Sequence, residues 1–416
     1  MLRRRRRPDL YDPDRWAVIR SSRRTGRRGK LDLQEPPERR LAIVPPRSEA
    51  IGKRHTLDED APITSIGSEL GAAPITDAVE TPRERALRWR NIAARYGSPD
   101  IRRSSIQLLT SAVPFAALWV AMSLTVDDAY WATLLLAVPA AAFLMRLFMI
   151  QHDCGHRSFF KSRLLNDMLG SAIGVLTLTP HAYWRTAHNI HHATSGNLEK
   201  RGVGDISVLT VREYLALSRW KRLLYRTYRH PLVFLGIGPL YVFIVKYRLP
   251  LDLLRRHRWM VPGVLATNAA IAAAGLGLGM WIGFAQVVMI HLPIVLLSSL
   301  AGVWLFYVQH QFEHTYWRQD ADWDFHEAAV HGSSFYDLPQ PLRWLTADIG
   351  IHHVHHLSSR IPNYRLAECL ADNPEMRGVS RITLGESLRC LRLALWDEDA
   401  GELIGFRALR QEATAA

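Results

Sequence analysis

Apolar residues are unevenly distributed along this 416-residue chain, and several apolar stretches are long enough to cross a lipid bilayer. Residues 106–126 carry no charge over 21 positions, and a helix of that length, rising about 1.5 Å per residue, spans the roughly 30 Å hydrocarbon core. Residues 129–150 are apolar apart from Arg146, whose guanidinium we expect to extend toward the headgroups. Since Asp127 and Asp128 supply a short polar turn between them, the two stretches predict a transmembrane hairpin.

A second apolar pair, residues 260–280 and 281–308, predicts another hairpin with a tight turn within residues 275–283. Positive residues flank both hairpins, as expected for cytosolic segments; they are Arg102, Arg103, Arg157, Lys161 and the basic run 255–258. Both hairpins should therefore begin and end in the cytosol. The pattern predicts an all-α integral membrane protein with four transmembrane helices in two hairpins.

The beginning of the chain has a different composition. Residues 1–100 are rich in arginine and proline and lack sustained apolar periodicity, so we predict a disordered cytosolic extension without a catalytic contact. The chain has a net charge of +13, much of it from this segment and from basic loops, which indicates an anionic partner or membrane surface. Nucleic acid is disfavoured, because a nucleic-acid-binding module does not need several membrane-spanning stretches.

Residues 101–370 form the predicted membrane domain, and residues 371–416 a cytosolic helical segment. A helix in the latter should begin at a capping box and place four leucines on one face; the residues are Thr383 and Glu386, then Leu384, Leu388, Leu391 and Leu395. The three cysteines are widely spaced and form no CxxC pair, so neither a disulfide framework nor a cysteine-bound cluster is predicted.

Histidines carry the candidate chemistry, because nine of the 18 fall in three compact clusters at the cytosolic edges of the apolar stretches, and eight of these nine follow an HxxxH or HxxHH spacing. The clusters are HDCGH with His152 and His156, HNIHH with His188, His191 and His192, and HHVHH with His352, His355 and His356. Spacings of i, i+3 and i+4 place side chains on one face of a helix, where they can converge on a metal. Crowded imidazoles gain little from packing alone, so the pattern indicates metal binding.

Eight imidazoles are too many for one tetrahedral zinc ion and enough for two ions that each keep an open position. The clusters also lack the HExxH pattern of zinc proteases, since Asp153 follows His152 and no glutamate lies within a cluster. Iron is favoured, because the abundant substrates at a bilayer edge are hydrocarbon chains, whose C–H bonds require an oxidant derived from O2 rather than a metal-bound hydroxide. The sequence predicts a binuclear iron centre.

Two weaker apolar segments, residues 169–178 and 232–245, would give a six-helix protein if both crossed the bilayer. A crossing by the first would put the cluster at His188 on the opposite side from those at His152 and His352, so one metal centre could not use all three. We therefore predict that both segments are interfacial or re-entrant.

The three clusters resemble the histidine boxes of the membrane fatty acid desaturase superfamily, over about residues 106–370. The sequence around the clusters is similar to that of bacterial acyl-lipid delta-12 or omega-6 desaturases. The segments that carry this similarity are HDCGHRSFF, WRTAHNIHHATSGNLEKRGVGD, QHQFEHTYW and IGIHHVHHLSSRIPNY. The resemblance implies a cytosolic helical cap holding a di-iron centre, with the eight box histidines as iron ligands. It also implies a ninth ligand near the end of the last transmembrane helix, for which we choose His310, with a supporting role for His314 beside Glu313.

The same resemblance implies an O2-dependent enzyme that introduces a cis double bond into the acyl chain of a membrane lipid, converting oleoyl to linoleoyl chains. Such an enzyme needs two electrons per turnover from a donor, and the chain has no haem, iron–sulfur or dinucleotide motif. We expect an external electron-transfer protein, ferredoxin or similar, at the cytoplasmic face of a bacterial inner membrane.

Other residues near the boxes are weaker candidates. Asp153 and Cys154 point away from the ligand face of a helix, which favours packing or support of a ligand over ligation. His291 is alone within the fourth span and is either a helix–helix hydrogen bond or a tunnel residue. Four aromatic residues could line an acyl tunnel or anchor the protein at the interface; they are Trp184, Phe335, Tyr336 and Trp344.

Two alternatives to desaturation stay open at this point. A hydroxylase, ketolase or desaturase of another lipid would use the same metal centre, and the sequence does not separate these reactions. A membrane protein that stores or transports metal would need acidic or histidine residues along a transmembrane path, and the predicted spans offer only His291. The sequence does not fix the double-bond position, the acyl carrier or the oligomeric state.

Overall fold

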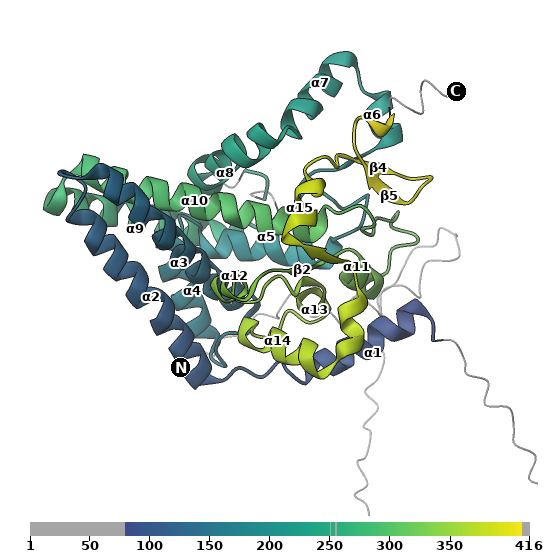
Figure 1. Cartoon of the computed structure of the whole chain (residues 1–416), viewed down its shortest axis with the longest axis horizontal. Coiled ribbons are helices and arrows are strands. Elements are labelled where there is room, and N and C mark those ends of the chain that lie inside the picture. Colours follow the sequence, from purple (N-terminus) through teal and green to yellow (C-terminus); the bar gives the residue numbers. More distant parts are fainter. Residues whose placement is uncertain (1–79, 250, 254–255, 410–416) are drawn as a thin grey trace, which may run out of the picture. The chain divides into compact units, whose positions relative to one another are not determined.

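A computed structural model describes residues 80–249, 251–253 and 256–409, all of which belong to one compact unit that begins at Thr76. Four of the described helices are long and apolar enough to cross a membrane, which confirms the four predicted spans. They are α2 (Ile101–Ser123), α3 (Tyr130–His156), α9 (Val261–Ile282, continuous with the short turn Arg258–Met260) and α10 (Phe284–His310). Helix α3 packs against both α2 and α10, so it lies at the centre of the membrane segment (Figure 1).

The two hairpins are tied together at their turns. Gly283 separates α9 from α10 and has φ of 102°, a backbone conformation that glycine adopts without steric cost. The side-chain amide of Gln286, one turn further, donates to Asp127 Oδ1 in the turn between α2 and α3 at 2.9 Å. The tight turn predicted within residues 275–283 therefore lies at the last residue of that range.

The C-terminal ends of α3 and α10 extend beyond the predicted spans and enter the histidine-rich region. Arg146 is buried at this level, 7% exposed, and its guanidinium donates to the carbonyl of Trp344 and lies 3.9 Å from the centre of that indole ring. The prediction that it extends toward the headgroups was wrong. Its charge is instead covered by α12 (Gln340–Leu345), which packs against α3.

The two weaker apolar segments differ in length. Helix α4 (Arg163–Leu176) has 14 residues, or about 21 Å, which is too short for the hydrocarbon core. Residues Leu232–Arg248 form a run of short helical pieces: η3 (Leu232–Ile237), α8 (Gly238–Leu240), η4 (Tyr241–Val245) and η5 (Lys246–Arg248). This run is bent by 60° from α7 (Arg219–Tyr228), so the pair is a broken span or a re-entrant loop, and its interfacial character stays a prediction.

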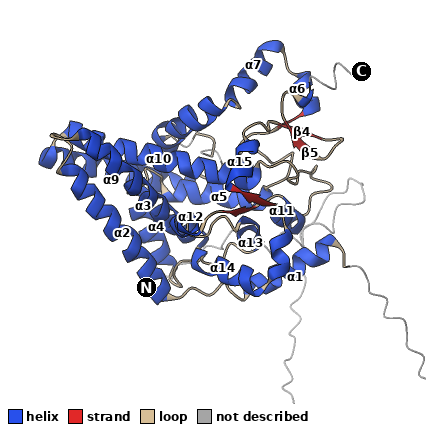
Figure 2. Ribbon diagram, viewed as in Figure 1, coloured by secondary structure: helices blue, strands red, loops and turns tan. Residues whose placement is uncertain are grey.

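Short helices and two small sheets form the cap (Figure 2). The remaining helices are α5 (His181–Thr194), α6 (Val211–Ala216), α11 (Phe325–His331), α13 (His352–Leu357), α14 (Asn363–Asp372), η7 (Pro374–Gly378) and α15 (Leu384–Cys390). One sheet has the order β1-β4-β5, parallel then antiparallel, from Leu209–Thr210, Leu395–Asp397 and Glu402–Ile404. The other pairs β2 (Phe335–Asp337) in parallel with β3 (Arg381–Thr383). The cysteines are buried and unpaired.

The predicted C-terminal helix is only partly correct. Its capping box is present at Thr383 and Glu386, but α15 has just seven residues, and Leu384 and Leu388 are exposed. Leu395, assigned to the same helical face, lies in β4 instead and is fully buried. Pairing with β1 and β5 accounts for this residue better than helical periodicity does.

The predicted disordered extension, residues 1–100, includes a folded helix at its end. Helix α1 (Pro82–Ala94) starts at a capping box between Thr81 and Glu84 and buries Ala86, Trp89 and Ala93 against α11 and α13. Local composition did not predict it, because the apolar partners of these residues come from the other end of the chain. The rest of the predicted extension, residues 1–79, lies outside the described residues.

Candidate metal centre

Four helices supply the nine histidines predicted as ligands. Helix α3 ends at His156 because Arg157 takes a left-handed conformation with φ of 58°, so His152 and His156 occupy its last turns. Helix α5 carries the second box, and the single six-residue helix α13 carries the third. His310 is the last residue of α10. The C-terminal ends of two membrane helices thus meet two cap helices at one place.

The nine imidazoles form two groups in which one ring nitrogen of each histidine lies within 4.8 Å of the others. The first group takes residues from α3, α5 and α13; they are His152, His156, His188, His192 and His355. The second takes residues from α5, α10 and α13; they are His191, His310, His352 and His356. Metal ligation by these residues stays a prediction, but the structure brings all nine together.

Ring nitrogens face one another within each group at distances that fit a shared ion. His188 and His355 each place Nε2 3.1 Å from Nε2 of His192. In the second group, His191 and His352 place Nε2 3.1 and 3.0 Å from Nε2 of His310. Two imidazole nitrogens that lie about 2.1 Å from one ion, at right angles to each other, are about 3.0 Å apart, so the donor set fits a first-row transition metal in each group.

The protonation of these histidines also favours metal. Burial, followed by the proximity of other histidines, holds the imidazole pKa well below its ordinary value of 6.5 at five residues outside the membrane spans; they are His188, His192, His352, His355 and His356. A neutral imidazole keeps a lone pair on one nitrogen, which is the form that binds metal. The centre therefore presents lone pairs without having to release protons first.

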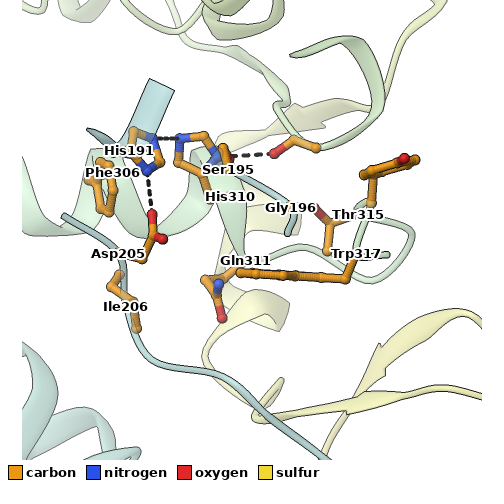
Figure 3. A pocket seen from close by; sticks show the side chains of 12 residues that line it. His191, Ser195, Gly196, Asp205, Ile206, Phe306, His310, Gln311, Thr315 and Trp317 are labelled. Atoms are coloured by element: carbon orange, nitrogen blue, oxygen red, sulfur yellow. Dashed lines mark hydrogen bonds and ion pairs between the residues drawn. The ribbon is translucent and has the colours of Figure 1, made fainter. Parts of the chain in front are cut away.

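Three ligand candidates are held by hydrogen bonds on their outer nitrogens. His152 Nδ1 lies 3.1 Å from Asp153 Oδ1, and His310 Nδ1 lies 3.0 Å from the carbonyl oxygen of Gly332. His191 Nδ1 contacts a carboxylate oxygen of Asp205, and Figure 3 shows His191 between this carboxylate and His310. The expected support of a ligand by Asp153 matches this geometry. Asp205 was missed, although it ends the segment GNLEKRGVGD, which follows the second box and carries part of the family resemblance.

His314 and His291 lie outside both groups. His314 is an exposed side chain, 3.5 Å from Glu402, and forms a surface cluster with Glu313 and Glu402 rather than contacting a box histidine. His291 Nε2 lies 3.0 Å from the carbonyl oxygen of Leu176 in α4, which is the helix–helix hydrogen bond considered for it.

A cavity of about 560 Å³ reaches both groups of histidines. His152 and His188 of the first group and His352 of the second line it, and its other walls are mostly apolar side chains from α3, α5, α10 and the run Leu232–Arg248. Of the four aromatic residues considered for an acyl tunnel, Trp184 lines the cavity. Phe335 and Tyr336 pack in hydrophobic clusters, and Trp344 covers Arg146.

Comparisons with known proteins match this architecture. A family model described as "Fatty acid desaturase" matches residues 129–384. A protein from Bacillus subtilis (strain 168) named "Fatty acid desaturase" is 46% identical over 317 residues, which cover 76% of this chain and 90% of that protein.

Two relatives from Synechocystis sp. carry more specific names. An "sn-1 oleoyl-lipid 12-desaturase" is 31% identical over 224 residues, or 53% of this chain and 62% of that protein. An "sn-1 acyl-lipid omega-3 desaturase (ferredoxin)" is 30% identical over 237 residues, or 53% of this chain and 61% of that protein. Because the sequence identities to these two relatives are nearly equal, they do not indicate which of the two double-bond positions applies to this chain.

Proposed function

Because this chain belongs to the fatty acid desaturase family, an oxidoreductase family acting on lipid, we propose that it uses two iron ions and O2 to desaturate a membrane-lipid acyl chain. The observation that carries the proposal is the meeting of an apolar cavity of about 560 Å³ with both histidine groups. A protein that only stored or transported metal would have no use for a cavity of this size and apolarity beside its ligands.

When bound, two iron ions would supply chemistry that side chains lack, namely the reduction of O2 coupled to removal of two hydrogens from adjacent carbons. The balance requires four electrons and four protons for each O2 reduced to two waters. Two of each come from the C–H bonds broken as the C=C bond forms, and the other two electrons come from a donor, with two protons from solvent. The protein would hold both ions with neutral imidazoles, and the mostly apolar walls of the cavity would disfavour water beside the reacting carbons.

The cavity gives the acyl chain a route from the membrane to the ions. Residues of α10 line the cavity from Val295 to Gln309, and Gln309 is next to the ligand candidate His310. That separation of 14 residues corresponds to about 21 Å of helix, more than the roughly 15 Å depth of one leaflet's hydrocarbon. A long acyl chain can therefore lie along α10 with an internal carbon pair next to the histidines.

We propose oleoyl chains already esterified in lipid as the substrate, with the new bond at the delta-12 (omega-6) position. The text around the boxes supports this choice, as does the similarity to a relative named as an oleoyl-lipid 12-desaturase. An external donor of the ferredoxin type is proposed because the chain has no electron-carrier motif and one relative's name includes ferredoxin. The flanking arginines and lysines favour an active site on the cytoplasmic face of a bacterial inner membrane.

The experiment that tests this function is expression in a host rich in monounsaturated lipid but lacking diunsaturated chains, followed by mass spectrometry that locates new double bonds or hydroxyl groups. A second cis bond at carbon 12 of oleoyl chains is the expected product, absent in a His352→Ala control of equal abundance. A delta-9 bond made from saturated chains would refute the proposed position alone, whereas a hydroxylated chain would refute desaturation.

A further inference from the structure

Each group of histidines includes one ring whose outer nitrogen meets a buried carboxylate. His152 of the first group contacts Asp153 at 3.1 Å, and His191 of the second group contacts Asp205. The side chains of these two aspartates are 2% and 6% exposed, respectively. A carboxylate in this position fixes the orientation of the ring, selects the tautomer that presents Nε2 to the metal, and increases the donor strength of that nitrogen.

We propose that Asp153 and Asp205 are positioning residues for the two metal sites, one for each ion. The inference rests on the proposed function, since it requires that both groups bind metal. Neither aspartate is a member of the two groups of potential metal ligands, so each would act through its histidine.

Asp153 is held by α14, which is in turn hydrogen-bonded to α2. Its Oδ2 accepts hydrogen bonds from the backbone N–H of Asn363 at 2.7 Å and from the side-chain amide of Asn363 at 2.8 Å. Asn363 is the first residue of α14, and its Oδ1 in turn accepts from Gln107 Nε2 of α2 at 2.8 Å. A chain of hydrogen bonds therefore runs from α2 through α14 to His152, and it links the orientation of this ring to the packing of the membrane domain against the cap.

Asp205 reaches His191 from a loop and depends on a glycine. Gly204 has φ of 75°, and a Cβ at this position would lie 2.7 Å from the carbonyl oxygen of Ala187 and 3.0 Å from His191 Cβ. Only glycine allows the loop to approach α5 this closely, so Gly204 brings the next residue against His191. A larger residue there would move Asp205 away.

Only one of the two carboxylate oxygens of Asp205 has a partner within hydrogen-bonding distance among the described residues. Its Oδ2 is buried and has no hydrogen-bond partner among the residues that the structure describes. A buried carboxylate is costly unless a positive charge or donors offset it, and a metal ion on the far side of His191 would provide that charge. Asp153, with two donors on its second oxygen, depends less on the ion.

The test measures Fe(II) bound per chain in purified protein during titration with a competing chelator, for wild type and for Asp153→Asn and Asp205→Asn. Loss of such a carboxylate typically weakens metal binding 10–100-fold. We therefore expect each variant to lose one iron at a chelator concentration where wild type keeps two, and the Mössbauer signal of a coupled pair to be replaced by that of a single ion. Asp205→Glu, which keeps the charge, should recover part of the affinity.

Asp167→Asn is the matched control, because Asp167 also contacts α5, but through Arg185 rather than through a histidine. It should bind both ions as wild type does, and melting of the metal-free proteins should be similar for all variants. Wild-type affinity for both ions in Asp153→Asn and Asp205→Asn would overturn this inference alone. The absence of iron from active wild type would overturn the proposed function as well.

Discussion

Helix α1 is predicted to hold the third histidine box in place, and replacing Trp89 by alanine tests this directly. Trp89 is 5% exposed and shares a hydrophobic cluster with Val354 and Leu357 of α13, the helix that carries His352, His355 and His356. Truncation of a buried tryptophan to alanine costs about 3–5 kcal/mol. That is a large part of the 5–15 kcal/mol by which a typical domain is stable, so the packing of α1 on α13 should fail before the membrane helices do.

The assay combines iron content with thermal unfolding of the purified protein. Trp89→Ala should lower the melting temperature and the iron content, because α13 would no longer hold His352, His355 and His356 in position. Trp131→Ala, at a site 70% exposed on the outer surface of α3, is the matched control and should change neither quantity. Wild-type melting and iron content in Trp89→Ala would refute the reasoning.

Two truncations test the two parts of the predicted extension. Removal of residues 1–79 should leave the iron content and the yield of product unchanged, whereas removal of residues 1–95 deletes α1 and should abolish both. Equal activity of the two truncated proteins would contradict this. Purified protein should contain about two irons per chain, and stoichiometric zinc in an active preparation would defeat an oxidative mechanism. Alanine at any one of the nine grouped histidines should abolish product, whereas His230→Ala and His257→Ala should keep it; activity of a site variant would remove that residue from the ligand set. Gly302 lines the cavity, and a Cβ there would lie 3.0 Å from Met145 Cε, so Gly302→Leu should reduce product at least 10-fold, with partial recovery in combination with Met145→Ala. Reporter fusions after Asp128 should be external and those after Gly196 cytoplasmic; an external signal at Gly196 would refute the four-span topology.

The membrane helices and the box histidines could be predicted because their signals are local. A span of about 20 apolar residues and histidines at helical spacing can be recognised without knowing any tertiary contact. The family resemblance implied a ninth ligand near the end of the last span, and His310 was preferred to His314 because it follows the apolar span directly. The structure separates the two, with His310 buried in the second group and His314 exposed at the surface.

The features that were missed depend on contacts between distant parts of the chain. Arg146 is buried because α12, nearly 200 residues later, covers it, and α1 folds because α11 and α13 provide its apolar partners. Asp205 lies only 14 residues from His191, but their contact requires the positive φ of Gly204. Hydropathy and spacing report none of these contacts, so composition placed the end of the extension at residue 100 and left Asp205 without a role.

The division of the nine histidines between the two groups explains why the second and third boxes end in adjacent histidines. In α5, His188 and His192 belong to the first group, and His191 to the second; in α13, His352 and His356 belong to the second group, and His355 to the first. Residues four apart share a helix face, whereas neighbours point about 100° apart, so an HxxHH helix placed between two ions offers two imidazoles to one and a single imidazole to the other. Since α5 and α13 favour opposite groups, together they supply three histidines to each group. The pair on α3 brings the first group to five histidines, and His310 of α10 brings the second to four. The prediction of His310 as a ninth ligand therefore has support from the placement of the two helices as well as from the family resemblance.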